Sequence, residues 1–516
     1  MKFSGEDGGY YVDLMKNLAN GNGFLTNIST FHQGLPELPY PSIVYPLWPL
    51  VGGFFAWLFN ITTAAYVISP LFYFLVVYLA YRVGKVFFPD IEVLLGGVRW
   101  NPGHMLAALF AINRLFFYAT SRPYTESLAY ILVLTTMLLA HKFLHEPSSL
   151  RGGALGLLCA LALLCRTQMI LVCLTVIAIS ALMILCAKER KPYFIGFAAF
   201  CVSFAVVFSP ELLWLSQEKL QAGFGDYFRF SSYQRLKYLP PYETNIPVDG
   251  VVGYVLDRLQ GFGEAFHPFG DYGYHKIFRS LHYNAVFFVA YFLTNPREFL
   301  GLFKADIRER IMSHRSQICL WVFGLGAFVS THMIHIQSPS HEWYFATRHS
   351  MPVIFLFWLM TVFLLQRNKL WRNVAALCLA LTICIGVMDI NKAHRNMRRR
   401  SHTWPALDFR VLYTWLNNKT ETDGRFTVVT NHVLAKFLAP FTSDVGYRTI
   451  MAYDDIDVLK IMFDKLESDY LILDTKPVGS ERDEYKDLRE IMNSTQVPGF
   501  THQTTIGPYY IYKRAQ

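Results

Sequence analysis

Two adjacent carboxylates, Glu6 and Asp7, stand near the start of the chain and are followed directly by Gly8 and Gly9. A carboxylate held beside an acceptor group can take its proton, which is general-base chemistry. The two glycines have no side chains, so a bulky ligand could come close to the backbone there. The segment is therefore a candidate for proton transfer. The structural alternative is a solvated acidic loop, because Asp and Glu are mostly exposed in proteins.

Three further charged residues lie at the ends of apolar stretches. Glu126 begins one such stretch, Arg166 ends another, and Arg348 precedes a third. Ionisable groups at a membrane edge are functional candidates, and a guanidinium group is a good partner for a phosphate. The alternatives are structural: Glu126 would stabilise a helix N-terminus, and Arg166 would extend to the lipid interface.

The elements that must position these residues are predominantly apolar. Hydrophobic residues make up 53% of the chain and charged residues 16%, where a soluble domain has about a quarter charged. Residues 42–59 are apolar but rich in proline, which favours a helix lying along the membrane interface. Segments long enough to span a membrane are predicted at 66–84, 104–120, 125–144, 168–187, 193–213, 283–302, 317–336, 350–366 and 372–390, with a weaker one at 151–166.

The distribution of Lys and Arg predicts the orientation of these segments. Most basic residues fall in alternate loops, which is the bias of cytoplasmic loops, and this explains much of the net charge of +9 without nucleic-acid binding. The N-terminal carboxylates, Arg166 and Arg348 are then expected outside. The basic run 391–400 does not fit this orientation, because alternate crossing of the segments places it outside. Either one segment does not cross the membrane as predicted, or the run contacts acidic lipid on the outer face.

The composition changes from about residue 400 to alternating apolar strands and polar helices. Helices are predicted at 405–418 and 456–466, and strands at 426–430, 470–474 and 509–512. We therefore predict two domains, a membrane domain over 1–390 and an extracytoplasmic α/β domain over 391–516. The α/β domain has no Gly-rich phosphate loop, which favours a supporting or acceptor-binding role.

Two external loops interrupt the membrane domain, at 1–42 and 216–281. The second is rich in aromatic residues, which suit sugar stacking in a lid over the substrate or, alternatively, ordinary interfacial packing. No apolar segment precedes Glu6, although an outside N-terminus of this kind normally follows a signal anchor. We therefore expect a first transmembrane helix upstream of this chain.

Cysteine and histidine patterns do not indicate a metal centre. None of the eight cysteines lies within 391–516, and no disulfide framework or CxxC site is implied. A zinc site built on His332, His335 and His341 is not favoured, because no carboxylate accompanies the first two at a fixed spacing. We expect no cofactor and leave a divalent metal open.

Four segments, in order, resemble the GT-C glycosyltransferases, polytopic enzymes that use lipid-phosphate-linked sugars and include protein O-mannosyltransferases and lipid A aminoarabinose transferases. Residues 6–24, with the turn Gly21-Asn22-Gly23-Phe24, are similar to their first external loop, and the Pro-rich segment 45–50 follows as it does there. The turns at 120–128 and 163–168 resemble two further family features. The segment 341–352 is similar to the family's late Arg-Tyr-x-x-Pro turn, with His349 at the usual Tyr position.

The resemblance implies a polytopic α-helical membrane protein of GT-C-like fold with a C-terminal soluble α/β domain. It implies Asp7 as catalytic base, with Glu6 as the other candidate, Glu126 as an acid that positions the acceptor, and Arg166 and Arg348 as phosphate ligands. The remaining candidates for substrate binding are Tyr10, Tyr11, Arg122, Glu342 and His349.

The implied function is transfer of a sugar from a polyprenyl-phosphate donor to a lipid, glycan or protein acceptor, outside the plasma (inner) membrane and among membrane lipids. The sequence leaves the sugar, the acceptor and the prenyl chain open. A transporter or flippase is one alternative, although such proteins commonly contain internal repeats and none is found between the halves. A non-catalytic membrane scaffold is the other.

Overall fold

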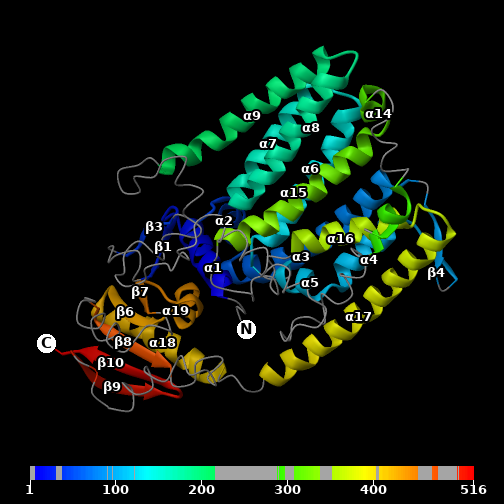
Figure 1. The fold of residues 1–516 in the computed structure, drawn as a ribbon. Helices are drawn as coiled ribbons and strands as arrows, with labels where there is room; N and C mark the ends of the chain where they lie inside the picture. Colours follow the sequence, from blue (N-terminus) through cyan, green and yellow to red (C-terminus); the bar gives the residue numbers. More distant parts are fainter. Residues whose placement is uncertain are drawn as a thin grey trace, which may run out of the picture.

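The structure is a computed structural model that describes residues 6–30, 38–42, 44–89, 91–95, 97–120, 123–215, 287–288, 290–296, 307–337, 351–401, 406–450, 468–474, 497 and 499–515. Long helices form an elongated body, and a sheet covered by two helices lies at one end of it (Figure 1). The N-terminal helix α1 (Glu6–Ala19) lies where the body meets the sheet.

Helix α1 packs closely against α2 (Leu47–Leu58) through two glycines of α2. A Cβ atom on Gly52 would lie 2.3 Å from the sulfur of Met15, and one on Gly53 would lie 2.8 Å from Cβ of Leu18. Glycine at these positions therefore allows the two helices to touch. A helix was predicted here, within 42–59, and this is confirmed. A two-stranded ladder of β1 (Leu25–Thr26) and β3 (Tyr40–Pro41) lies between the two helices in the sequence.

Most of the predicted apolar segments form helices, and the weak segment 151–166 is one of them. The segment 283–302 is described only at 287–288 and 290–296. The body contains α3 (Ile61–Phe87), α4 (Pro102–Ile112), α5 (Arg114–Thr120), α6 (Glu126–His145), α7 (Ser149–Cys165), α8 (Ile170–Cys186), α9 (Lys191–Leu215), α14 (Ile307–Ser313), α15 (Arg315–Gln337), α16 (Met351–Leu364) and α17 (Lys369–Ser401). Among the described residues, four helices are long and apolar enough to cross a membrane: Thr63–Phe87, Glu126–His145, Lys191–Trp214 and Lys369–Met388.

One segment that was predicted as a single continuous helix is divided in two. The segment 104–120 is two helices, α4 and α5, because Asn113 adopts an extended backbone conformation between them. The Oδ1 atom of Asn113 accepts a hydrogen bond from the Phe116 backbone N–H at 3.2 Å, so this side chain caps the start of α5. Apolar periodicity alone does not reveal such a cap.

Helices α7 and α9 cross where glycines remove the side chains between them. A Cβ atom on Gly152 would lie 1.9 Å from the carbonyl oxygen of Gly196, and one on Gly156 would lie 2.2 Å from that of Phe200. Close approach through small residues is the usual way in which helices associate in membranes. Near the start of α4, β4 (Val93–Leu95) and β5 (Val98–Trp100) form a short hairpin.

The sheet has six strands in the order β2-β7-β6-β8-β10-β9. Its strands are β2 (Ile28–Thr30), β6 (Phe426–Asn431), β7 (Val445–Ile450), β8 (Tyr470–Asp474), β9 (Phe500–Ile506) and β10 (Tyr509–Arg514). Strands β2, β7, β6 and β8 are parallel, and β10 is antiparallel to β8 and β9. The predicted strands at 426–430, 470–474 and 509–512 are confirmed, whereas the predicted helix 456–466 lies outside the described residues.

The six strands and two helices together form a unit that we call the sheet unit, and one of its strands comes from the N-terminal segment. Helix α18 (Ala406–Asp423) confirms the helix predicted at 405–418 and extends it by more than one turn. Helix α19 (His432–Leu438) and the 3-10 turn η5 (Ala439–Phe441) connect β6 to β7. Strand β2 belongs to the N-terminal segment yet pairs with β7, so residues from both ends of the chain form one sheet.

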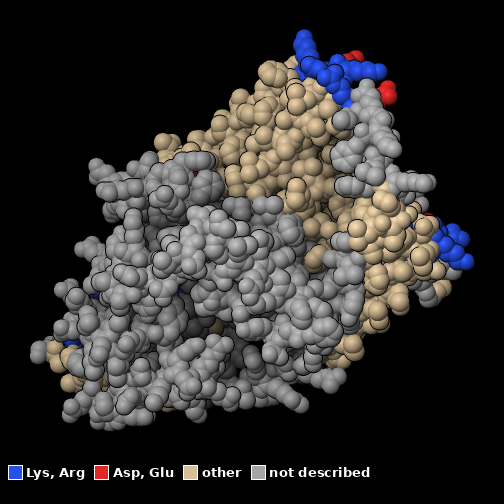
Figure 2. Space-filling view, viewed as in Figure 1, with Lys and Arg blue, Asp and Glu red and all other residues tan. Residues whose placement is uncertain are grey.

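The basic residues at the junction of α8 and α9 and at the start of α17 lie at one end of the body, away from the sheet. Figure 2 shows Lys and Arg at the tip where α8 meets α9 and at the right-hand end where α17 begins. At this end His145 of α6 accepts a hydrogen bond from Arg315 of α15 at 2.8 Å, with the Nδ1 atom as acceptor. Helix α17 starts there and continues past residue 390 to the sheet side (Figure 1).

Candidate functional site

Glu6 and Asp7 begin helix α1, and the glycines that follow fix where this turn lies. A Cβ atom on Gly9 would lie 2.0 Å from the carbonyl oxygen of Lys436 in α19, and one on Gly8 would lie 3.2 Å from Cγ of Pro123. The expectation that these glycines leave room for a bulky ligand is therefore wrong. They let the first turn of α1 fit between the sheet unit and the turn that precedes α6.

Gly9→Ala is expected to lower the thermal unfolding midpoint, because its methyl group would overlap the Lys436 carbonyl. Overpacking of this kind costs about 1–3 kcal/mol. Gly153→Ala is the matched control, since the nearest atom to a Cβ on this helical glycine is 4.0 Å away. We expect Gly153→Ala to be neutral or slightly stabilising in the same unfolding measurement. Equal midpoints for the two variants would contradict the close contact between α1 and α19.

Helix α1 is held in place by a buried carboxylate that sequence analysis did not single out. Asp13 is fully buried, and its Oδ2 atom accepts hydrogen bonds from the Asn27 backbone N–H at 2.8 Å and from Thr26 Oγ1 at 3.0 Å. Its Oδ1 atom accepts a third from Asn27 Nδ2 at 3.1 Å. Burial raises the pKa of Asp13, and these donors oppose the shift. The network ties α1 to the segment that leads into β2.

Lys16 forms the second anchor of α1, to the sheet unit itself. Its Nζ atom donates a hydrogen bond to the Ala439 carbonyl at 3.2 Å and another to the Thr442 carbonyl. Burial lowers the pKa of Lys16, while the charge of Asp13 acts in the opposite direction. Asp13 and Lys16 are three residues apart on one face of the helix, and this spacing is the only sequence signal for the pair.

Tyr10 and Tyr11 lie in packed surroundings. The Tyr10 hydroxyl is hydrogen-bonded to Ser42 Oγ at 3.1 Å, and burial raises the pKa of Tyr10 to about 12. The Tyr10 ring packs against the core of the sheet unit, whereas Tyr11 packs against the core formed by α1, α2 and α6. Both side chains therefore join α1 to its neighbours, and substrate contact by either remains a prediction.

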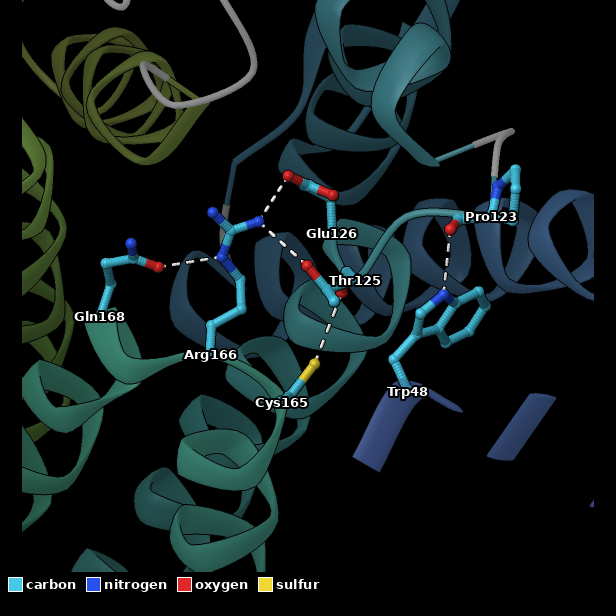
Figure 3. A network of polar contacts seen from close by, with 7 residues as sticks. All are labelled: Trp48, Pro123, Thr125, Glu126, Cys165, Arg166 and Gln168. Carbon is cyan, nitrogen blue, oxygen red and sulfur yellow. Dashed lines mark hydrogen bonds and ion pairs between the residues drawn. The ribbon is translucent and has the colours of Figure 1, made fainter. Parts of the chain in front are cut away.

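Glu126 and Arg166 form a direct ion pair that joins the start of α6 to the end of α7 (Figure 3). The Arg166 NH1 atom also donates to Thr125 Oγ1 at 3.0 Å, and its Nε atom donates to Gln168 Oε1 at 2.9 Å. The two charged side chains are only 5% and 14% exposed, respectively. Sequence analysis assigned these two residues separate roles, because their positions in the chain do not show that they are partners.

The same turn is tied to helix α2. The Trp48 indole N–H donates to the Pro123 carbonyl at 3.1 Å, and the Cys165 thiol donates to the Thr125 carbonyl at 3.5 Å (Figure 3). A Cβ atom on Gly8 would lie 3.2 Å from Cγ of Pro123, so this turn lies beside the start of α1 and is also hydrogen-bonded to α2 and α7. The N-terminal carboxylate segment and the ion pair are therefore parts of one packed assembly.

The ion pair borders a pocket with about 730 Å³ of empty space, part of it open to the outside. Helices α6, α8, α15 and α16 and the 3-10 turn η2 (Thr167–Met169) provide its walls. Most of the lining is apolar, including Val133, Val172, Phe323 and Phe355, and the charged groups in the lining are Glu126 and Arg166. Such a pocket can hold an apolar chain with a charged group at one end.

Several sequence candidates are not placed. Arg122, Glu342, Arg348 and His349 lie outside the described residues, as do His341 and the loop 216–281. Within the described part of the chain, no group of three or more His, Cys, Asp or Glu side chains is placed to hold a metal ion.

Comparisons with known proteins match the architecture. No protein-family model and no curated protein sequence matches the chain. The archaeal oligosaccharyltransferase AglB from Archaeoglobus fulgidus, solved with an inhibitory peptide and a dolichol-phosphate, superposes with a TM-score of 0.53 at 11% identity over 99% of this chain and 70% of that one. Another structure of an oligosaccharyltransferase from this organism, tethered to an acceptor peptide, gives a TM-score of 0.49 at 12% identity over 98% and 70%. The chain has a GT-C-like fold, the fold of AglB.

Proposed function

We propose that this protein is an integral-membrane glycosyltransferase that moves a sugar from a polyprenyl-phosphate donor to a lipid, glycan or protein acceptor. The observation that carries the proposal is the Glu126–Arg166 pair at the edge of an apolar pocket. The turn that precedes Glu126 lies beside the first turn of α1, where Glu6 and Asp7 begin the helix. A donor with a phosphate head and an apolar chain matches both parts of this site.

Asp7 is the proposed base, with Glu6 as the other candidate. Its carboxylate takes the proton of the acceptor as the acceptor attacks the anomeric carbon, and the bond from that carbon to the phosphate oxygen breaks. The polyprenyl phosphate leaves with the bonding electrons. Fixed cations stabilise this departing anion, and a water-excluded site strengthens their effect. The reaction needs no metal, although a divalent ion remains compatible with it.

Arg166 and Arg348 are the proposed phosphate ligands. A guanidinium group carries five N–H donors, so Arg166 can contact Glu126 and a phosphoryl oxygen at the same time. Glu126 holds Arg166 at the pocket edge and positions the acceptor from the same turn. Arg122, Glu342 and His349 remain proposed substrate contacts, as do the aromatic residues of the loop 216–281.

A multi-pass position in the plasma (inner) membrane is part of the proposal. Large apolar side chains are exposed along α3 and α9, for example Phe74 at 66% and Val206 at 65%, and lipid would cover them. Basic loops gather at the end far from the sheet, which is the bias of a cytoplasmic side. Residues 1–390 would then form the catalytic membrane domain and 391–516 an extracytoplasmic domain, with β2 of the first external loop completing its sheet.

The test is transfer of radiolabelled sugar from synthetic polyprenyl-phosphate donors, catalysed by the protein in lipid nanodiscs. The acceptors are a peptide library, a glycan pool and a lipid extract, and the inhibitory peptide in the AglB complex makes the peptide library the first to try. We expect label in one acceptor class. In proteoliposomes of the same protein, label that crosses the membrane still attached to its lipid would instead identify a flippase.

A further inference from the structure

Tyr130 lies one helical turn after Glu126 in α6 and lines the same pocket as Glu126 and Arg166. Residues four apart in a helix share a face, so the tyrosine stands directly beyond the ion pair. Its ring packs against Phe116 with centroids 5.0 Å apart and against Phe110 with centroids 6.0 Å apart. These contacts fix the position of the ring, and hence of its hydroxyl.

The Tyr130 hydroxyl is buried and has no hydrogen-bond partner among the described residues. Other tyrosines of the body are satisfied: the Tyr73 hydroxyl donates to the Ala111 carbonyl at 2.8 Å, and that of Tyr193 donates to the Leu144 carbonyl at 2.7 Å. A buried polar group without a partner costs about 1–3 kcal/mol, so such groups usually meet water or a ligand. Other buried hydroxyls without a partner, such as that of Ser127, do not line the pocket.

We infer that the Tyr130 hydroxyl donates a hydrogen bond to a phosphoryl oxygen of the lipid donor, an inference that rests on the proposed function. A neutral phenol is a donor, and the oxygen of a phosphate beside Arg166 is a strong acceptor. The apolar pocket walls lower the local dielectric constant, which strengthens this bond. Tyr130 is thereby a substrate-binding residue that recognises the donor's headgroup, and the prenyl chain extends along the apolar walls.

Tyr130→Phe tests this inference, because it removes the hydroxyl and keeps the ring. Binding of a fluorescent short-chain polyprenyl phosphate and of the matching polyprenol is measured in nanodiscs, together with the thermal midpoint of the ligand-free protein. We expect the affinity for the phosphate to fall by about 10- to 150-fold, the usual effect of one hydrogen bond to a charged group. The affinity for the polyprenol stays unchanged, and the midpoint stays the same or rises.

Tyr193→Phe is the matched control at the opposite end of the body. It removes a satisfied hydroxyl, so we expect a lower thermal midpoint and unchanged binding of both lipids. If the Tyr130→Phe variant bound the phosphate as tightly as the wild-type protein, the inference would be overturned and the proposed function would stand. An equal loss of affinity for the phosphate and the polyprenol would also overturn it, by showing an effect on the chain. If the wild-type protein bound no polyprenyl phosphate, both the inference and the proposed function would fail.

Discussion

Asp7→Asn should reduce sugar transfer by about 100- to 10,000-fold, the range lost when a general base is removed. The amide keeps the size of the carboxylate but cannot take the acceptor's proton. The donor should still bind, because the proposed phosphate ligands are unchanged. The measurement is the rate of sugar transfer under saturating donor, with donor binding determined in parallel.

The neighbouring acids give the controls for this experiment. Glu6→Gln distinguishes which of the two carboxylates is the base, and we expect it to retain most of the activity. Asp13→Asn makes the same substitution in the same helix, and it replaces one of the two oxygens that accept three hydrogen bonds with an NH2 group. At least one of these hydrogen bonds is lost, so the thermal midpoint should fall. Full activity of a folded Asp7→Asn protein would disprove the assignment of the base.

Arg166→Met is the second change with a large expected effect. It leaves the nearly buried Glu126 carboxylate without its guanidinium partner, and breaking a buried pair in this way costs about 3–5 kcal/mol. Donor binding should also weaken strongly, since one of the two proposed phosphate ligands is gone. Thermal unfolding and binding of polyprenyl phosphate measure the two effects separately.

The double variant Glu126→Gln/Arg166→Met separates stability from function. Removing both charges avoids the uncompensated carboxylate, so much of the lost stability should return. Activity and donor binding should not return, because no cation replaces Arg166. A double variant that recovered both stability and donor binding would show that the ion pair is only structural.

The sequence predicted most of the helices because each long apolar run is a local signal. It also predicted three of the strands in the C-terminal unit, where short apolar runs alternate with polar helices. It missed the break at Asn113, where a side-chain cap interrupts a continuous apolar pattern. It also missed β2, because pairing Ile28 with Tyr447 joins residues more than 400 positions apart and leaves no local pattern.

The sequence was sufficient to single out charged residues of the candidate site, but it did not show which of them form a pair. Glu126 and Arg166 stood out as charges in apolar surroundings, yet only the packing of α6 on α7 shows that they are partners. Gly8 and Gly9 suggested space for a ligand, but a glycine that leaves space and a glycine that allows close packing look the same in a sequence. Only the structure shows that these two allow close packing. Tyr130 looked like one of many aromatic residues, and only its buried, unpartnered hydroxyl distinguishes it.

The most direct test of the account is discharge of the donor. Purified protein in nanodiscs is incubated with a panel of polyprenyl-phosphate sugars and membrane extract, and the free polyprenyl phosphate that is released is quantified by mass spectrometry. We predict release with the wild-type protein from at least one donor, with loss of release in both Asp7→Asn and Arg166→Met. Absence of release and of donor binding across the panel, or equal release from the wild-type protein and both variants, would contradict the proposal that this site transfers sugar from a lipid phosphate.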